Sequence, residues 1–201
     1  MNNTNVLLIF TRNPELGKVK TRLAKTIGDE KALSIYKFLL THTANVTQKS
    51  SAKKVVYYSE NITADDNWNP AHFEKKLQQG NDLGERMQHA FEESFASGAC
   101  NVIIIGSDLY DLTEKHIEKA FSKLEKHDVV IGPAEDGGYY LLGLKKVDPE
   151  IFQQKNWGTD TVLRDTLENL KNLDVALLTP LNDVDVFEDI KTHPAFQKFL
   201  K

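Results

Sequence analysis

Six short apolar runs are the feature that most constrains the fold of this chain. They are rich in Val, Ile, Leu and Tyr, and they lack the alternation of polar and apolar residues that a half-exposed strand shows. This pattern predicts strands that are buried on both faces of a sheet. The six runs are Val6–Phe10, Val55–Tyr58, Val102–Ile105, Val129–Ile131, Tyr139–Leu144 and Val175–Leu178.

Amphipathic segments separate these runs and predict helices. The first follows Asp29 as an N-cap, the second follows Asp82, the third follows Thr113, and the fourth covers Thr161–Leu173. Strands that alternate with helices predict an α/β fold with a mostly parallel, doubly wound sheet and helices on both faces. A length of 201 residues fits one domain, so we expect residues 1–201 to form a single unit.

Composition excludes several classes of protein. The net charge of −4 argues against non-specific nucleic-acid binding, which needs a basic surface. The one cysteine, Cys100, excludes an internal disulfide and a cysteine-rich metal site, as expected in a reducing cytosol. The chain starts without the features of a signal peptide, and no apolar run approaches the length of a membrane span. We therefore expect a cytoplasmic protein.

The loop after the first predicted strand is strongly basic. It has the sequence TRNPELGKVKTRL and carries Arg12, Lys18, Lys20 and Arg22 ahead of a helix. Ligands of doubly wound sheets bind beyond the carboxyl ends of the strands, and cations near a helix N-terminus suit a phosphate. The loop has neither the Walker spacing nor the dinucleotide-binding glycine pattern. It is either a phosphate-binding loop or a solvated basic turn.

Two acidic segments also follow predicted strands. Asp108 comes at the end of NVIIIGSD, and Asp183 and Asp185 occur in NDVDVFEDI, two residues apart on one face of an extended segment. A carboxylate from each segment would provide the oxygen ligands that Mg²⁺ or Mn²⁺ prefers. The alternative for Asp108 is a turn or N-cap role. Glu188 and Asp189 fit the first turn of a following helix.

The segment GPAEDGGYYLLGL places an acidic pair before two glycines. Asp136 is a candidate to hydrogen-bond a sugar hydroxyl or to deprotonate an acceptor, and Gly137 and Gly138 allow a ligand to approach the backbone. A tight turn that leads into a strand is the alternative.

The segment QQGNDLGERM opens the second predicted helix. Gly80, Asp82 and Arg86 at this helix entry are candidates to contact a base, ribose or phosphate. The alternative for Asp82 is an N-cap.

Taken in order, these motifs resemble a known family. The chain resembles the glycosyltransferase-like family called rSAM/selenodomain-associated transferase 1. The motifs that carry this resemblance are F-T-R-x-P-x-x-G-x-x-K-T-R-L, Q-G-x-D-L-G-E-R-M, G-S-D-x-x-x-L-T, D-G-G-Y-Y-L-L-G-L, W-G-T and D-V-D. That family is similar to molybdenum-cofactor guanylyltransferases and to nucleotide-diphospho-sugar transferases of the GT-A type. The resemblance runs from Phe10 to Asp185 and implies a GT-A-like fold.

The resemblance also implies roles for individual residues. Arg12 and Lys20 match the loop that holds the nucleotide's phosphates, and Asp108 and Asp185 match the two metal-binding aspartates. The acceptor side is matched by Gly137, Gly138 and Trp157, the last being either a wall of the acceptor pocket or a core aromatic. Tyr110 stands where the family often has proline, and DVDVFEDI lacks the usual Thr and Pro, which changes loop shape and leaves the aspartates in place.

We therefore expect a metal-dependent transferase that uses a nucleotide or nucleotide sugar and a small-molecule acceptor. Glycosyl transfer would use Asp136 as the base that activates the acceptor. The alternative, nucleotidyl transfer from a nucleoside triphosphate to a phosphorylated small molecule, would use Lys20 and the metal to stabilise charge on the α-phosphate. A non-catalytic nucleotide-binding module is a further alternative. The missing glycine fingerprint argues against an NAD(P)-linked oxidoreductase.

Overall fold

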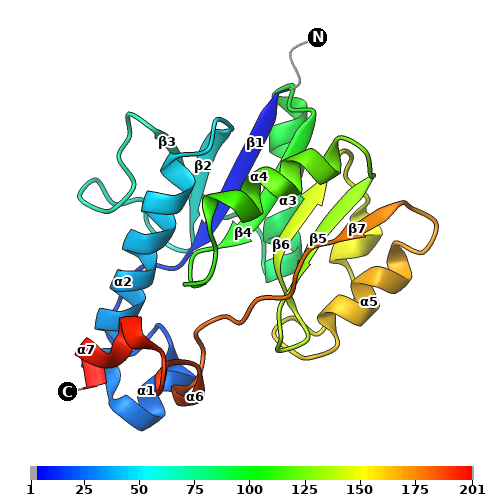
Figure 1. Ribbon diagram of the computed structural model, residues 1–201. Helices are drawn as coiled ribbons and strands as arrows, with labels where there is room; N and C mark the ends of the chain where they lie inside the picture. The colour runs from blue at the N-terminus through cyan, green and yellow to red at the C-terminus, as the bar shows by residue number, and fades with distance from the viewer. Residues whose placement is uncertain (1–3, 201) are drawn as a thin grey trace.

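One sheet organises the protein. In the computed structural model, which describes residues 4–200, seven strands form a single sheet in the order β3-β2-β1-β4-β6-β5-β7 (Figure 1). The strands are β1 Asn5–Thr11, β2 Lys53–Tyr58, β3 Phe73–Leu77, β4 Asn101–Gly106, β5 Val129–Pro133, β6 Tyr139–Leu144 and β7 Val175–Leu177. All neighbours pair in parallel except β6, which is antiparallel to both β4 and β5. The predicted α/β fold with a mostly parallel sheet is confirmed.

One strand of the sheet, β3, was not predicted from the sequence. β3 has the sequence FEKKL, and only its first residue, Phe73, is buried. It lies at the edge of the sheet, where charged side chains prevent pairing with another chain and remove the apolar pattern of an inner strand. The six predicted strands are present with ends that shift by one or two residues.

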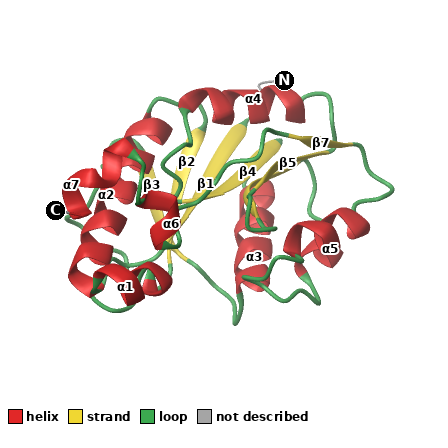
Figure 2. Cartoon of the chain, turned by 60° about the horizontal axis from the view of Figure 1, so that its bottom comes forward, coloured by secondary structure: helices red, strands yellow, loops and turns green. Residues whose placement is uncertain are grey.

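Helices cover both faces of the sheet (Figure 2). α2 and α4 pack on one face, and α3 and α5 pack on the other. The α-helices are α1 Thr21–Ile27, α2 Asp29–Gln48, α3 Leu83–Ala96, α4 Glu114–Leu124, α5 Val162–Asn169, α6 Phe187–Ile190 and α7 Gln197–Leu200, and short 3₁₀ turns cover Pro149–Phe152 and Pro194–Phe196.

Alternation along each strand explains the two cores. Leu7 and Ile9 of β1 pack with α2 and α4, whereas Val6 and Leu8 pack with α3. Successive side chains of a strand point to opposite faces, so a strand covered on both sides is apolar at every position. This is why the strands appear in the sequence as continuous apolar runs.

The helix starts follow capping chemistry. Asp82 is the N-cap of α3 and accepts a hydrogen bond from the Glu85 amide, and Thr113 caps α4. At α2 the prediction was displaced by one residue, because Gly28 is the N-cap and Asp29 is the first helical residue. α5 ends at Asn169, short of the predicted Leu173. No helix within residues 4–200 is long and apolar enough to cross a membrane.

A third apolar cluster lies beyond the carboxyl end of β1. Leu23 of α1 and Ile35 of α2 pack there against Val184, Ile190 and Phe196 from the end of the chain. After β7 the chain crosses below the sheet to reach this cluster (Figure 1). The crossing carries the DVD segment past the end of β4, where the Val184 amide hydrogen-bonds to the Asp108 carbonyl at 3.4 Å.

Candidate functional site

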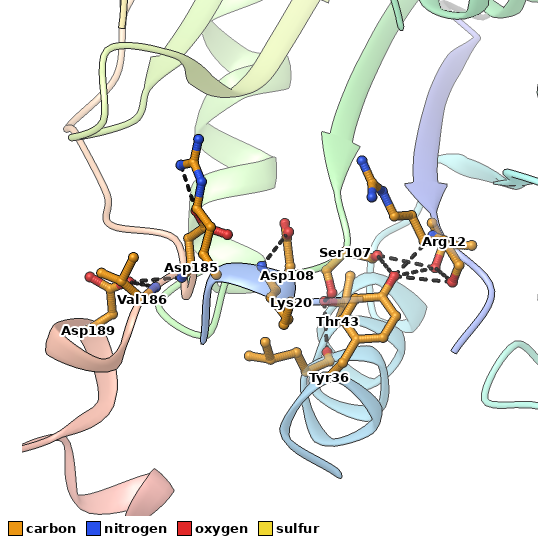
Figure 3. Close-up of polar contacts among 12 residues, drawn as sticks. Arg12, Lys20, Tyr36, Thr43, Ser107, Asp108, Asp185, Val186 and Asp189 are labelled. Carbon is orange, nitrogen blue, oxygen red and sulfur yellow. Dashed lines mark hydrogen bonds and ion pairs between the residues drawn. The ribbon is translucent and has the colours of Figure 1, made fainter. Parts of the chain in front are cut away.

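Tyr36 of α2 connects the ends of the two central strands. Its hydroxyl accepts a hydrogen bond from the Arg12 amide at 3.0 Å and donates to the Arg12 carbonyl at 3.1 Å. It also lies 3.4 Å from the hydroxyls of Thr11 and Ser107 (Figure 3). One buried phenol therefore fixes the residues that follow β1 and β4, and burial raises its pKa above the usual value.

Lys20 and Asp108 form the central ion pair of the site. The Lys20 Nζ lies 2.7 Å from Asp108 Oδ2 (Figure 3). The Lys20 side chain is 5% exposed and that of Asp108 is 37% exposed, so the carboxylate is the member open to a ligand. Lys20 has a left-handed backbone with φ of 49° at the N-cap of α1. A non-glycine residue in this conformation is strained, and such strain is concentrated at functional sites.

Each charge stabilises the other. Burial alone would lower the pKa of Lys20, but the adjacent Asp108 carboxylate outweighs it and raises that pKa. Burial alone would raise the pKa of Asp108, but Lys20, with a smaller contribution from Arg12, keeps it below its usual value. Both groups are therefore charged at neutral pH.

The DVD segment places its two aspartates differently. Asp183 lines a cavity together with Asp108 and Asp136. Burial, together with the charges of these two carboxylates, raises the pKa of Asp183 to about 6. Asp185 instead forms an ion pair with Arg22 at 2.9 Å and does not line the cavity. Of the two DVD aspartates, Asp183 is therefore the one that shares the cavity with Asp108.

Asp189 fixes the backbone of this segment. Its Oδ2 accepts hydrogen bonds from the amides of Asp185 and Val186 at 2.8 and 2.7 Å (Figure 3). Its Oδ1 accepts one from the Asn182 side chain. Asp189 and Glu188 lie in the first turn of α6, as predicted. An acidic residue here satisfies free amides at the start of the helix.

The cavity has a volume of about 230 Å³ and lies beside the Lys20–Asp108 pair. Three carboxylates, those of Asp108, Asp136 and Asp183, line it. The remainder is mostly apolar, and includes Phe10, Leu83, Met87, Tyr139, Trp157 and Val162. The arrangement combines a charged rim with an apolar interior, which is typical of a small-molecule site.

The cavity wall depends on a close contact at Gly84. A Cβ atom there would lie 2.7 Å from Nε1 of Trp157 and 2.3 Å from the Phe152 carbonyl oxygen. Only glycine therefore lets the indole of Trp157 pack over the first turn of α3. Trp157 lines the cavity and also packs against the core on this face.

The two glycines of the AEDGG turn have different surroundings. Gly138 lines the cavity, and its amide donates to Asp136 Oδ1 at 2.9 Å. Gly137 has a φ of +90°, and a Cβ on it would lie 2.3 Å from the Asp160 carbonyl oxygen. Gly137 therefore packs against the backbone of the loop before α5, outside the cavity, and holds that loop beside the turn.

The Gly80–Arg86 segment is tied to itself. The Arg86 Nε donates to the Gly80 carbonyl at 3.0 Å, and its Nη1 reaches Gln78 Oε1 at 3.4 Å. Asp82 is occupied as the N-cap of α3. Gly80, Asp82 and Arg86 do not line the cavity, and their contacts shape the loop that leads to Leu83.

Two residues of the site were not singled out from the sequence. Asp183 was considered beside Asp185, and nothing in the DVD pattern says which of the two faces Asp108. Tyr36 lies among the buried apolar residues of α2, and no motif marks it as a site residue. A tyrosine among aliphatic positions of a helix indicates a buried polar contact, because a buried phenol needs a hydrogen-bond partner.

Comparison with known proteins gives the family. A model described as "Uncharacterized protein conserved in bacteria (DUF2064)" matches residues 42–159. The chain belongs to the DUF2064 family. No curated protein matches it in sequence. The narrower resemblance to the rSAM/selenodomain-associated transferases stays a prediction.

Solved structures share the fold of this DUF2064 protein. A protein from Desulfovibrio desulfuricans G20, named for an inferred nucleotide-diphospho-sugar transferase activity, is 32% identical with a TM-score of 0.86, over 98% of this chain and 93% of the other. The 4-diphosphocytidyl-2C-methyl-D-erythritol synthase of Anaerococcus prevotii DSM 20548 is 9% identical with a TM-score of 0.62, over 98% and 96%. Rv0371c of Mycobacterium tuberculosis H37Rv, in complex with manganese, is 12% identical with a TM-score of 0.56, over 94% and 95%.

Proposed function

We propose that this DUF2064 protein is a metal-dependent transferase that moves a glycosyl group from a nucleotide sugar to a small-molecule acceptor. The observation that carries the proposal is the cavity in which Asp108, Asp136 and Asp183 converge, next to the buried Lys20. The 32%-identical relative bears the name of a transferase with the same class of donor.

The phosphates of the donor belong on the side of Lys20 in this proposal. The positive charge of the exposed Arg12 acts on Asp108, and Arg22 forms an ion pair with Asp185 of the DVD segment. A diphosphate placed here would receive charge-assisted hydrogen bonds, which are stronger than neutral ones. The left-handed backbone at Lys20 orients its ammonium group toward the Asp108 carboxylate.

The residues present fit a divalent metal ion. Asp108 and Asp183 supply carboxylate oxygens, the donors that Mg²⁺ and Mn²⁺ prefer, and the Lys20 ammonium already occupies a cation position on Asp108. No cluster of three or more His, Cys, Asp and Glu side chains within residues 4–200 encloses a metal by itself. Magnesium usually takes one or two protein carboxylates and completes its shell with substrate phosphates and water. A bound ion would neutralise charge on the departing nucleoside diphosphate.

Asp136 is the proposed base for the acceptor hydroxyl. It is exposed at the cavity rim, and within residues 4–200 only its Oδ1 receives a hydrogen bond, from the Gly138 amide. The other oxygen is available to an acceptor. In nucleotidyl transfer to a phosphate the nucleophile is already ionised at neutral pH, so a base in this position would have no task.

A thermal-shift screen tests the proposal. Nucleoside diphosphates and nucleotide sugars are added to the protein with and without Mn²⁺ or Mg²⁺. We expect a rise in melting temperature that needs both nucleotide and metal, because a ligand that binds only the folded state stabilises it. Asp108→Asn should abolish the metal-dependent part, and Asp111→Asn, on the same loop but outside the cavity, should retain it. Absence of any nucleotide effect in the wild type would refute the proposal.

A further inference from the structure

The cavity beside the three carboxylates has no positive charge of its own. Among the described residues that line it, none is a lysine or an arginine. The lining residues whose side chains carry polar atoms are Asp108, Asp136, Asp183, Thr159, Tyr139, Tyr140 and Trp157. A phosphate ester bound here would meet the carboxylates of Asp136 and Asp183, whose repulsion no lining cation offsets, whereas the charge of Asp108 is paired with Lys20.

Four cations near the cavity each have a polar partner of their own. Lys20 is held on Asp108, and Arg22 is held on Asp185. On the opposite side, Lys155 donates to Asn169 and Arg164 pairs with Asp165. The charge distribution therefore separates a phosphate-binding side from a cavity that suits an uncharged group.

The size and walls of the cavity indicate what that group is. Its volume of about 230 Å³ exceeds the roughly 150 Å³ that accommodates a benzene ring, so it holds one substituted ring. Phe10, Tyr139 and Trp157 offer aromatic surface to such a ring. Asp136 is exposed at the rim, where it would meet a hydroxyl of the bound ring.

We propose that this cavity binds the acceptor, and that the acceptor is an uncharged, hydroxyl-bearing ring compound and not a phosphate ester. The inference rests on the proposed glycosyl transfer and names its substrate class. The acceptor hydroxyl gives its proton to Asp136 while its oxygen bonds to the anomeric carbon of the donor sugar. The bond from that carbon to the diphosphate oxygen breaks, and its electron pair leaves with the nucleoside diphosphate.

Two matched pairs of compounds test the inference: benzyl alcohol with benzyl phosphate, and cyclohexanol with cyclohexyl phosphate. Binding is followed by the indole N–H resonance of Trp157 in ¹⁵N-labelled protein. Trp68 provides an internal control, because it is buried in the core on the other face and should not shift. We expect the alcohols to shift Trp157 at millimolar concentrations, as usual for ligands of this size. The phosphates should bind at least about tenfold more weakly.

A charge-introducing variant sharpens the test. Thr159→Lys puts a cation on the cavity wall at an exposed position that tolerates a long side chain. It should raise the affinity for the phosphates and reduce or reverse the preference for the alcohols. Leu173→Lys adds the same charge at an exposed site that does not line the cavity and should leave the preference unchanged.

Two results would overturn the inference: phosphates that bind wild type as tightly as the alcohols, or a Trp157 resonance that no compound shifts. If nucleotides still stabilise the protein in either case, the transferase proposal stands and only the acceptor class is wrong. If the alcohols bind and no nucleotide does, the cavity is correctly assigned and the transferase proposal fails.

Discussion

The two sides of the candidate site are built in different ways. On the side that follows β1 and β4, hydrogen bonds and an ion pair set the geometry: Tyr36 holds the Arg12 backbone, and Lys20 holds Asp108. On the side that follows β5, close packing sets it: Trp157 lies over Gly84, and Gly137 abuts Asp160. The first side is polar and cationic, and the second is apolar with carboxylates at its rim.

This difference fits donor binding on the first side and acceptor binding on the second. Fixed cations and backbone groups suit recognition of a charged donor, and a nucleotide-activated donor is charged whatever the acceptor is. A packed apolar cavity suits recognition of a particular acceptor by shape. Substitutions on the first side should therefore change donor binding, and those on the second should change turnover and acceptor choice.

The largest effect is expected at Asp136. Asp136→Asn keeps the Oδ1 that accepts from the Gly138 amide but removes the proton acceptor. We expect kcat to fall by roughly 10²–10⁴-fold at saturating substrates, with donor affinity unchanged. Steady-state kinetics with a donor and acceptor found in the screens measure it. Glu135→Gln, an exposed neighbour outside the cavity, is the control, and a kcat within about threefold of wild type in Asp136→Asn would exclude the base.

The next effect concerns donor binding at Lys20. Lys20→Met should weaken nucleotide binding by roughly 10–100-fold, because a hydrogen bond to a charged group contributes about 1.5–3 kcal/mol. Lys18→Met is the matched control on the same loop, since Lys18 is exposed and pairs with Glu15 at 2.7 Å. Isothermal titration of both variants compares them. Equal losses would mean that the loop acts only as diffuse positive charge.

A smaller effect is expected on stability at Tyr36. Tyr36→Phe removes the partner of the Arg12 amide and should lower the free energy of unfolding by about 1–3 kcal/mol. Tyr140→Phe, which loses a single bond to the Thr179 carbonyl, should lower it by about 1 kcal/mol. Urea denaturation measures both. Nucleotide affinity should fall only in Tyr36→Phe, and an equal fall in both variants would contradict its role at the strand ends.

The smallest effect is a gain in stability from Asp183→Asn. Between about pH 4 and 6 the folded wild type keeps a proton on Asp183 that the unfolded chain has released, so wild-type stability falls as pH rises through this window. The variant avoids this loss and should be about 1 kcal/mol more stable at pH 7, a modest value because the group is partly exposed. The two proteins should converge near pH 4. Denaturation at both pH values, without metal, checks this, and a variant less stable than wild type at pH 7 would contradict it.

Periodicity in the sequence determined the fold. Strands covered on both faces must be apolar at every position, and helices must carry one apolar stripe, so six strands and the α/β class could be predicted. The caps at Asp82 and Thr113 could be predicted because these residue types favour the start of a helix. The edge strand β3 could not, because only Phe73 of FEKKL is buried. The antiparallel direction of β6 was also hidden, since a buried strand has the same composition in either direction.

The candidate site was determined by the sequence only in part. The sequence predicts that residues after the strands lie near one another, because the carboxyl ends of parallel strands meet at one edge, and Asp108, Asp136 and Asp183 do line one cavity. Which aspartate of the DVD segment faces Asp108 was decided by tertiary structure: Asp189 fixes that backbone, Arg22 takes Asp185, and Asp183 is left in the cavity. These contacts join residues up to 163 positions apart, and local sequence patterns carry no information about pairings at that separation.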